Sequence, residues 1–167
     1  MEPGSSRENP IVRPSARALL FDPGGRLLLF RVAEIDWDTG RPFWITPGGG
    51  LEEGEDHLAA VQREIVEETG LGAVEIGPCV WVRNHSWLWQ DVWLMSSERY
   101  YLARTSQTEI SESYRTELEL QALAEHRWWT IDEIAASADT FVPRRLAELL
   151  PPLIAGEIPP EPFDTGV

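Results

Sequence analysis

Three glutamates on one predicted helix constrain this chain more than any other feature of its sequence. Apolar residues at spacings of three and four predict a helix over residues 56–69, and Gly70 is suited to end it in a left-handed conformation. Glu64, Glu67 and Glu68 lie three and four positions apart, so their carboxylates share one patch in the last two turns. The sequence therefore concentrates negative charge at the helix end that already carries partial negative charge.

This arrangement opposes the stability of the helix. Each pair of like charges at such a spacing costs about 0.2–0.5 kcal/mol, and the helix dipole adds to that cost. A cluster of like charges that destabilises its own helix is typical of a functional site. A divalent cation would cancel the repulsion between the carboxylates. Mg²⁺ and Mn²⁺ prefer oxygen ligands of this kind. The alternative interpretation is a solvated acidic face that binds nothing.

The glutamates belong to a longer pattern that resembles the signature of the Nudix hydrolases. The pattern matches every fixed position of the 23-residue box, and it reads Gly49-x5-Glu55-x7-Arg63-Glu64-Ile65-Val66-Glu67-Glu68-Thr69-Gly70-Leu71. Such a match is far more selective than a lone glycine motif. The resemblance implies an α/β fold, namely an α/β/α sandwich with a mixed β-sheet. It also implies metal-dependent hydrolysis of a pyrophosphate bond in a nucleoside diphosphate linked to another moiety, with water attacking phosphorus.

The resemblance also implies roles for individual residues of the box. Metal ligation is expected of Glu64, Glu67 and Glu68, with the backbone carbonyl of Gly48 as a further ligand. Catalytic roles are expected of Arg63, Glu64 and Glu67: the arginine would fix the carboxylates, and Glu64 would accept a proton from the attacking water. The expected ion is Mg²⁺, with Mn²⁺ as a substitute.

Members of the family often supply one more acid from a loop distant in sequence. Residues 109–125 form the other acid-rich segment of this chain, and the candidates there are Glu117, Glu119 and Glu125. We favour Glu117 or Glu119, and we group both with Arg31 as candidate substrate-binding residues. A solvated loop without a role in the site is an equally good interpretation of this segment.

Tryptophans are numerous, and some of them are candidates for stacking on a base. Trp44 lies just before the glycine loop, which is the segment Thr46-Pro47-Gly48-Gly49-Gly50. It is a candidate substrate-binding residue, with Trp37 as a further possibility. Trp87, Trp89 and Trp93 share parity along an extended stretch and are therefore expected on one face of a sheet. Packing in a core or at a dimer interface is the more common use of tryptophan, and it is favoured here.

The remaining pattern predicts one Nudix-type domain over residues 11–157, between a flexible tail at 1–10 and a Pro-rich tail at 158–167. Strands are expected at 16–21, 26–32, 43–45, 74–83, 87–95, 99–103 and 126–130. After the box, helices are expected at 131–136 and 142–149, the second closed by Pro151 and Pro152. Residues 104–124 are expected to form a polar stretch.

Composition narrows the range of partners. The chain has 28 acidic and 14 basic residues and a net charge of −14, which makes it a poor candidate for tracking a nucleic-acid polymer. No apolar run approaches a membrane span, the N-terminus lacks the features of a signal peptide, and Cys79 is the only cysteine. We therefore expect a cytoplasmic enzyme that acts on a nucleotide-type small molecule, without a membrane partner and with a homodimer as one option.

Two other functions are compatible with a Nudix-type fold. A Nudix-fold module could bind a nucleotide as a non-catalytic sensor or regulator, but such modules tend to lose carboxylates that this chain retains. An isomerase of isoprenoid diphosphates would need a cysteine ahead of the box, whereas Cys79 follows it. Among hydrolase substrates, nucleotide sugars resembling ADP-ribose, nucleoside triphosphates and dinucleotides all remain open.

Overall fold

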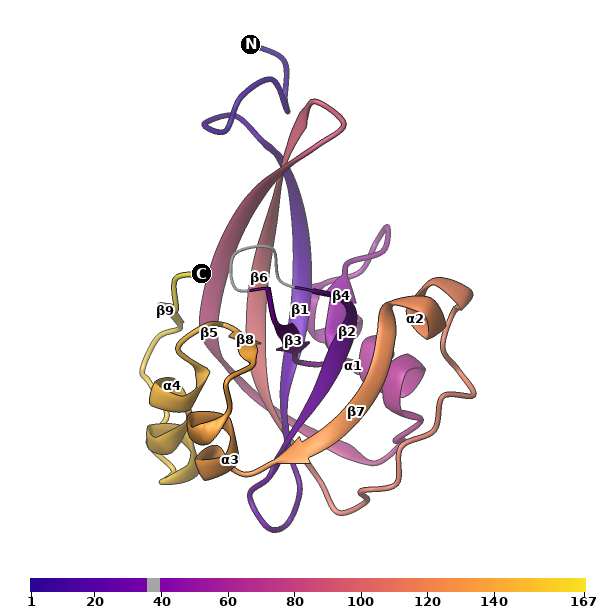
Figure 1. The fold of residues 1–167 in the computed structure, drawn as a ribbon, viewed down its shortest axis with the longest axis vertical. Helices are drawn as coiled ribbons and strands as arrows, with labels where there is room; N and C mark the ends of the chain where they lie inside the picture. Colours follow the sequence, from indigo (N-terminus) through magenta and orange to yellow (C-terminus); the bar gives the residue numbers. More distant parts are fainter. Residues whose placement is uncertain (36–39) are drawn as a thin grey trace.

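The computed structural model describes residues 1–35 and 40–167, and in these residues a mixed sheet carries helices on both faces (Figure 1). The strands are β1 (Ile11–Phe21), β2 (Leu27–Ile35), β3 (Pro42–Ile45), β4 (Gly48–Gly50), β5 (Val74–Trp89), β6 (Val92–Thr105), β7 (Leu123–Trp129), β8 (Thr140–Val142) and β9 (Phe163–Asp164). The helices are α1 (His57–Thr69), α2 (Glu117–Ala122), α3 (Ile131–Ala136) and α4 (Leu146–Ile154). This arrangement confirms the expected α/β sandwich with a mixed sheet.

The sheet runs in the order β8-β3-β2-β1-β6-β5-β9, while β4 pairs with β1 and β7 pairs with β2. The parallel pairing of β1 with β6 and the antiparallel β5–β6 hairpin form its long central part (Figure 1). Strand β1 therefore has neighbours on both edges, and β4 brings the glycine loop against it.

Two apolar cores lie on opposite faces of the sheet. Along β1, Ala18 and Leu20 pack toward α1, whereas Leu19 and Phe21 pack in the core that contains α4 residues such as Leu150. Successive side chains of a strand point to opposite faces, so a strand covered on both sides is apolar throughout. This explains why the second half of β1 is a continuous apolar run.

Helix α1 begins and ends where its sequence predicts. Its N-cap, Asp56, accepts a hydrogen bond from the Ala59 N–H, and its C-cap, Gly70, adopts a left-handed conformation with φ of 73°. The Gly70 N–H donates to the Val66 carbonyl. These caps fix the direction in which the acidic last turns point.

The β5–β6 hairpin differs from the predicted set of three strands. Its turn is at Gln90 and Asp91, which have φ of 47° and 63°, and the flanking strands are continuous. A two-residue turn of this kind is usually signalled by Asn-Gly or Asp-Gly. This turn contains no glycine and so has no such signal, and the prediction of one strand over residues 87–95 is wrong.

The same turn overturns the expected common face of three tryptophans. Trp93 on β6 pairs with Leu88 on β5, whereas Trp87 and Trp89 pair with other residues of β6. Paired residues share a face, so Trp93 lies on the face opposite to Trp87 and Trp89. The predicted common face is wrong because the turn at Gln90 and Asp91 interrupts the alternation of side chains between Trp89 and Trp93.

Two helices also differ from expectation. Helix α4 extends to Ile154 and contains Pro151 and Pro152, which were expected to close it. The Pro151 carbonyl still accepts a hydrogen bond from the Ala155 N–H, because proline lacks a donor but keeps its acceptor. Helix α2 lies in the stretch expected to be only polar, and the pattern Thr116-x-x-Glu119 is the capping signal that marks it.

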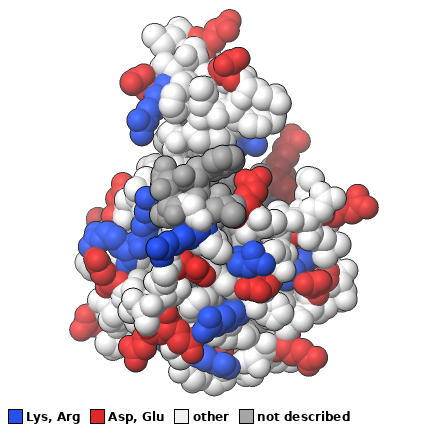
Figure 2. Space-filling view, in the orientation of Figure 1, with Lys and Arg blue, Asp and Glu red and all other residues white. Residues whose placement is uncertain are grey.

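Both ends of the chain contact the long hairpin. The Gly4 carbonyl accepts a hydrogen bond from the Trp93 N–H, and β9 pairs with Trp81 and Val82 of β5. On the face drawn in Figure 2, the described arginines are interspersed with acidic side chains. Within the described residues, no helix is long and apolar enough to span a membrane.

Candidate functional site

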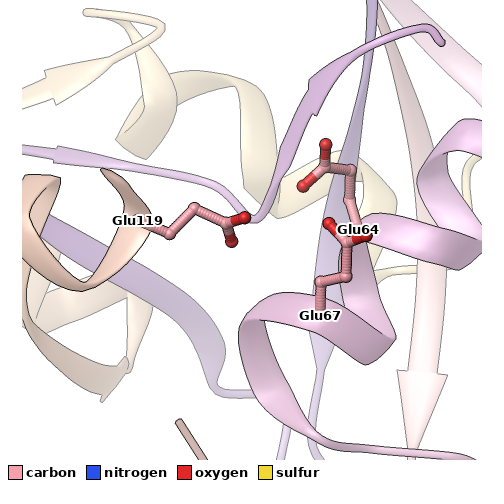
Figure 3. A group of neighbouring side chains, drawn as sticks. All are labelled: Glu64, Glu67 and Glu119. Carbon is pink, nitrogen blue, oxygen red and sulfur yellow. The ribbon is translucent and has the colours of Figure 1, made fainter. Parts of the chain in front are cut away.

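Three carboxylates from two helices converge beside the glycine loop. Glu64 and Glu67 of α1 and Glu119 of α2 each offer an oxygen, and these oxygens lie within 4.8 Å of one another. Figure 3 shows the three side chains pointing toward a common space. The structure thus brings one acid of the 109–125 segment to the box glutamates that lie more than fifty residues earlier.

Arg63 holds this side of the site together. Its Nε and Nη2 atoms donate to the two oxygens of Glu55 at 2.8 and 2.9 Å, and its Nη1 atom donates to Glu64 at 3.0 Å and to Glu67 at 3.2 Å. The Nη2 atom also donates to the Gly50 carbonyl at 3.0 Å. One planar guanidinium therefore fixes three carboxylates and the loop, which an ammonium could not do.

The pair formed by Arg63 and Glu55 also sets their charge states. The hydrogen bond from Arg63, followed by the backbone N–H of Glu52, lowers the pKa of Glu55 to about 2. The bond to Glu55 in turn raises the pKa of Arg63 above its ordinary value. Both groups are therefore charged at neutral pH, and Glu55 acts as a fixed anchor for the arginine.

The glycine loop permits a close approach that no other residue would allow. A Cβ atom on Gly49 would lie 2.4 Å from Oε1 of Glu64, and a Cβ atom on Gly48 would lie 2.2 Å from the Ala16 carbonyl oxygen. Gly48 also has φ of 147°, where side chains are strained. The two glycines thus let β4 pass directly between β1 and the acidic face of α1.

Glu68 takes a different position from the other box glutamates. It is 5% exposed, and its Oε2 atom accepts a hydrogen bond from the Gly48 N–H at 3.2 Å. Burial raises the pKa of Glu68 well above its ordinary value, and the negative charge of Glu64 raises it further. Glu68 is therefore not part of the group of Glu64, Glu67 and Glu119, and it contacts the loop instead.

Sequence reasoning missed a partly buried ion pair that supports the loop from the other side. Arg17 of β1 donates to the carbonyls of Thr46 at 3.1 Å and Gly48 at 3.3 Å, and its Nε atom lies 3.4 Å from Glu98 of β6. Although burial alone would raise it, the positive charges of Arg17 and Arg83 hold the pKa of Glu98 below its ordinary value. This contact depends on the β1–β6 register, for which the sequence contains no local signal.

The charge balance of the carboxylate group fits a cation. Burial raises the pKa of Glu64, the contact with Arg63 opposes that shift, and the charges of Glu119 and Glu67 add to it. The Oε2 atom of Glu119 is buried and has no hydrogen-bond partner among the described residues. A divalent cation between these oxygens would satisfy that atom and remove the repulsion, so the residues present fit such an ion.

The other predicted site residues lie elsewhere. Glu117 is exposed on α2 and is not part of the group, while Arg31 of β2 pairs with Glu125 of β7 at 3.3 Å. Trp44 is 3% exposed, and its Nε1–H donates to Asp139 at 2.9 Å. Its ring meets Trp129 edge-on, and Trp44 belongs to the core on the face of the sheet opposite α1. Trp37 lies outside the described residues.

The chain is similar to known proteins along most of its length. A NUDIX domain family model matches residues 12–150. An RNA pyrophosphohydrolase from Caulobacter vibrioides is 31% identical over 140 residues, which cover 75% of this chain and 76% of that protein. An RNA pyrophosphohydrolase from Wolbachia pipientis is 26% identical over 163 residues, which cover 87% and 93%.

Solved structures show the same fold at lower identity. A MutT protein from Methanosarcina mazei superposes with a TM-score of 0.59 at 20% identity, over 84% of this chain and 93% of that one. An ADP-ribose pyrophosphatase from Streptococcus suis gives a TM-score of 0.56 at 17% identity, over 91% and 97%. At these identities, the likeness extends to the fold alone.

Proposed function

Because the chain belongs to the Nudix hydrolase family, we propose that Glu64, Glu67 and Glu119 bind Mg²⁺, or Mn²⁺ in its place. With this ion, the protein hydrolyses a pyrophosphate bond in a nucleoside diphosphate that is linked to another moiety. The observation that carries this proposal is the convergence of Glu64, Glu67 and Glu119 within 4.8 Å. Two separate helices direct like charges at one another there, which costs free energy unless a cation lies between them.

The chain's own residues divide the work of this reaction. Glu64 accepts the proton of the attacking water, whose oxygen forms a bond to phosphorus while the bridging P–O bond breaks toward the leaving phosphate. Arg63 keeps the Glu64 carboxylate oriented through the 3.0 Å hydrogen bond. When bound, the divalent cation neutralises charge on the pyrophosphate oxygens. Glu67 and Glu119 would hold it through their carboxylate oxygens.

Glu68 and the Gly48 carbonyl complete the proposed set of ligands. The carbonyl oxygen has two lone pairs, so the hydrogen bond from Arg17 leaves a second one for the cation. Glu68 accepts the Gly48 N–H through one oxygen and can offer its other oxygen. A nearby cation would also offset the charge of Glu64, which raises the pKa of Glu68.

A second candidate substrate follows from the names of the relatives, which are RNA pyrophosphohydrolases. In an RNA strand, pyrophosphate bonds occur only in the 5′-terminal polyphosphate, so such a substrate presents the same chemical group to the site. The net charge of −14 opposes extensive contact with an RNA backbone. We therefore propose that only the terminal nucleotide of an RNA would enter the site.

A substrate panel tests both versions of the proposal. The purified protein is incubated with Mg²⁺ and either nucleoside diphosphate derivatives or a 5′-triphosphorylated oligoribonucleotide, with the 5′-monophosphorylated strand as the matched control. We expect metal-dependent release of a nucleoside monophosphate from the nucleoside diphosphate derivatives, or of phosphate or pyrophosphate from the 5′-triphosphorylated strand, and neither from the control. Binding of nucleotides without hydrolysis of any compound would instead favour a non-catalytic sensor.

A further inference from the structure

The segment that precedes α2 is docked onto the C-terminus of α1. The last carbonyls of a helix lack partners within the helix, and here two of them find partners in this segment. The Ser111 N–H donates to the Thr69 carbonyl at 2.8 Å, and Arg115 Nε donates to the Glu68 carbonyl at 2.9 Å. Because α1 has no basic residue in its own last turn, Arg115 supplies positive charge at that end.

The side chain of Arg115 is buried at a position where an apolar residue would cost less. It is 1% exposed, and its guanidinium lies 5.0 Å from the ring centre of Phe30. Its Nη1 atom donates to Glu112 at 3.2 Å, but its Nη2 atom is buried and has no partner among the described residues. A buried charge that is incompletely paired weakens a fold, so its presence calls for a role other than stability.

Helix α2 is anchored in the core only at its C-terminal end, where its C-cap, Leu123, is buried. It has six residues, none of which is buried, so no apolar face anchors it. Arg115 directly precedes its N-cap, Thr116, whose hydroxyl donates to Oε1 of Glu119 at 2.9 Å and accepts the Glu119 N–H at 3.2 Å. The orientation of Glu119 therefore depends on where the segment before the helix is fixed.

We propose that Arg115 is a positioning residue that joins α2 to the end of α1 and so sets Glu119 opposite Glu64 and Glu67. This inference rests on the proposed function, because it assigns Arg115 to the same cation site. Arg115 itself contacts only the protein. The segment also lies close to Gly70, because a Cβ atom added to Gly70 would lie 2.8 Å from the Cβ atom of Ser111. The contact between the segment and the end of α1 therefore requires glycine at position 70.

The test measures binding of Mn²⁺ alone by titration calorimetry in four proteins: the parent, Arg115→Met, Glu119→Gln and the double variant. Loss of a residue that orients a metal ligand typically weakens metal binding 10- to 100-fold. We expect Arg115→Met to raise the Kd for Mn²⁺ about tenfold in the parent. No further increase is expected in the Glu119→Gln protein, because the group being oriented is already altered.

Two controls separate positioning from stability. Arg115→Lys keeps the charge but cannot bond the Glu68 carbonyl and Glu112 in the same geometry, so it should weaken Mn²⁺ binding less than Arg115→Met does. It also remains measurable if the methionine variant does not fold. Ile134→Ala lies in the core on the other face of the sheet, and it should lower the melting temperature without changing the Kd.

The outcomes distinguish this inference from the proposed function. An equal increase in Kd with and without Glu119→Gln would show that Arg115 acts independently of Glu119 and would overturn the inference. So would an unchanged Kd in both Arg115 variants, provided that Glu119→Gln weakens binding. If the parent protein binds no Mn²⁺ at all, the cation site fails, and the proposed function fails with it.

Discussion

Helices α1 and α2 both contribute glutamates to the candidate site, but they are held by different forces. Helix α1 buries Ala60, Val61 and Ile65 against the sheet, and its caps are satisfied at both ends. Helix α2 buries no residue of its own, and it is held by its buried C-cap, Leu123, and by polar anchors at its N-terminal side, among them Arg115. Half of the site is therefore fixed by apolar packing, whereas the other half depends on a few directional contacts.

The difference has consequences for function. Apolar burial is non-directional and tolerates small changes, while a hydrogen-bonded anchor loses its effect once its geometry is lost. We expect substitutions in α1 to act through both stability and catalysis. Substitutions in and before α2 should act mainly on the position of one carboxylate.

The largest effect is expected for Glu68→Gln on α1. This change keeps the shape of a residue that contacts the Gly48 N–H, but it removes one negative charge beside Glu64. Turnover should fall about 1,000-fold, which corresponds to about 4 kcal/mol in the activation barrier. Glu53→Gln, at an exposed loop position, is the matched control, and equal rates for the two variants would show that the site is elsewhere.

A pair of alanine substitutions tests how each helix is held. Ile65 of α1 is 2% exposed, so Ile65→Ala should lower the free energy of unfolding by about 2–5 kcal/mol. Leu118 of α2 is 77% exposed, so Leu118→Ala should change it by no more than about 0.5 kcal/mol. Urea denaturation measures both. Similar losses would mean that α2 is packed as firmly as α1.

The contribution of α2 to catalysis is tested by two acids on the same helix. Glu119→Gln should lower turnover at least tenfold, or about 1.4 kcal/mol, because Glu119 faces the box glutamates. Glu117→Gln should leave turnover unchanged, because that side chain is exposed and is not part of the group. A decrease in the Glu117 variant with none in the Glu119 variant would reverse the assignment.

The smallest effect concerns stability without metal. Burial and Glu64 raise the pKa of Glu68, so the folded apo protein binds more protons than the unfolded chain, and its stability falls as pH rises through that pKa. Glu68→Gln removes this loss. Its melting temperature at pH 8 should exceed that of the parent by about 2–4 °C, a gain of about 1 kcal/mol. The gain should shrink at pH 5, and a gain independent of pH would refute the electrostatic cause.

The same contrast explains what could be predicted from the sequence. The α1 half is local: the cap at Gly70 and the contacts of Arg63 with Glu64 and Glu67 follow from positions one to four residues apart on a helix. The box also indicated the metal chemistry through its resemblance to a known family. Expectations for this half therefore needed little tertiary information.

The α2 half could not be predicted in the same way. The sequence could not rank Glu117 and Glu119, because tertiary contacts, such as that of Arg115 with the Glu68 carbonyl, determine which one faces α1. Likewise, the contact between Arg17 and Glu98 depends on the register of two parallel strands far apart in sequence. Long-range register and burial carry no local signal. This is also why Trp44, apolar and next to the loop, was expected at the site and lies in the core.

The most direct test of the central claim is a crystal structure of the protein grown with Mn²⁺, with anomalous scattering used to locate the ion. We predict an anomalous peak within coordination distance of carboxylate oxygens from both helices, Glu64 and Glu67 on α1 and Glu119 on α2. An Mn²⁺ ion bound only by α1, with Glu119 turned away, would contradict the two-helix site. A structure in millimolar Mn²⁺ without any ion at these glutamates would contradict the metal site itself.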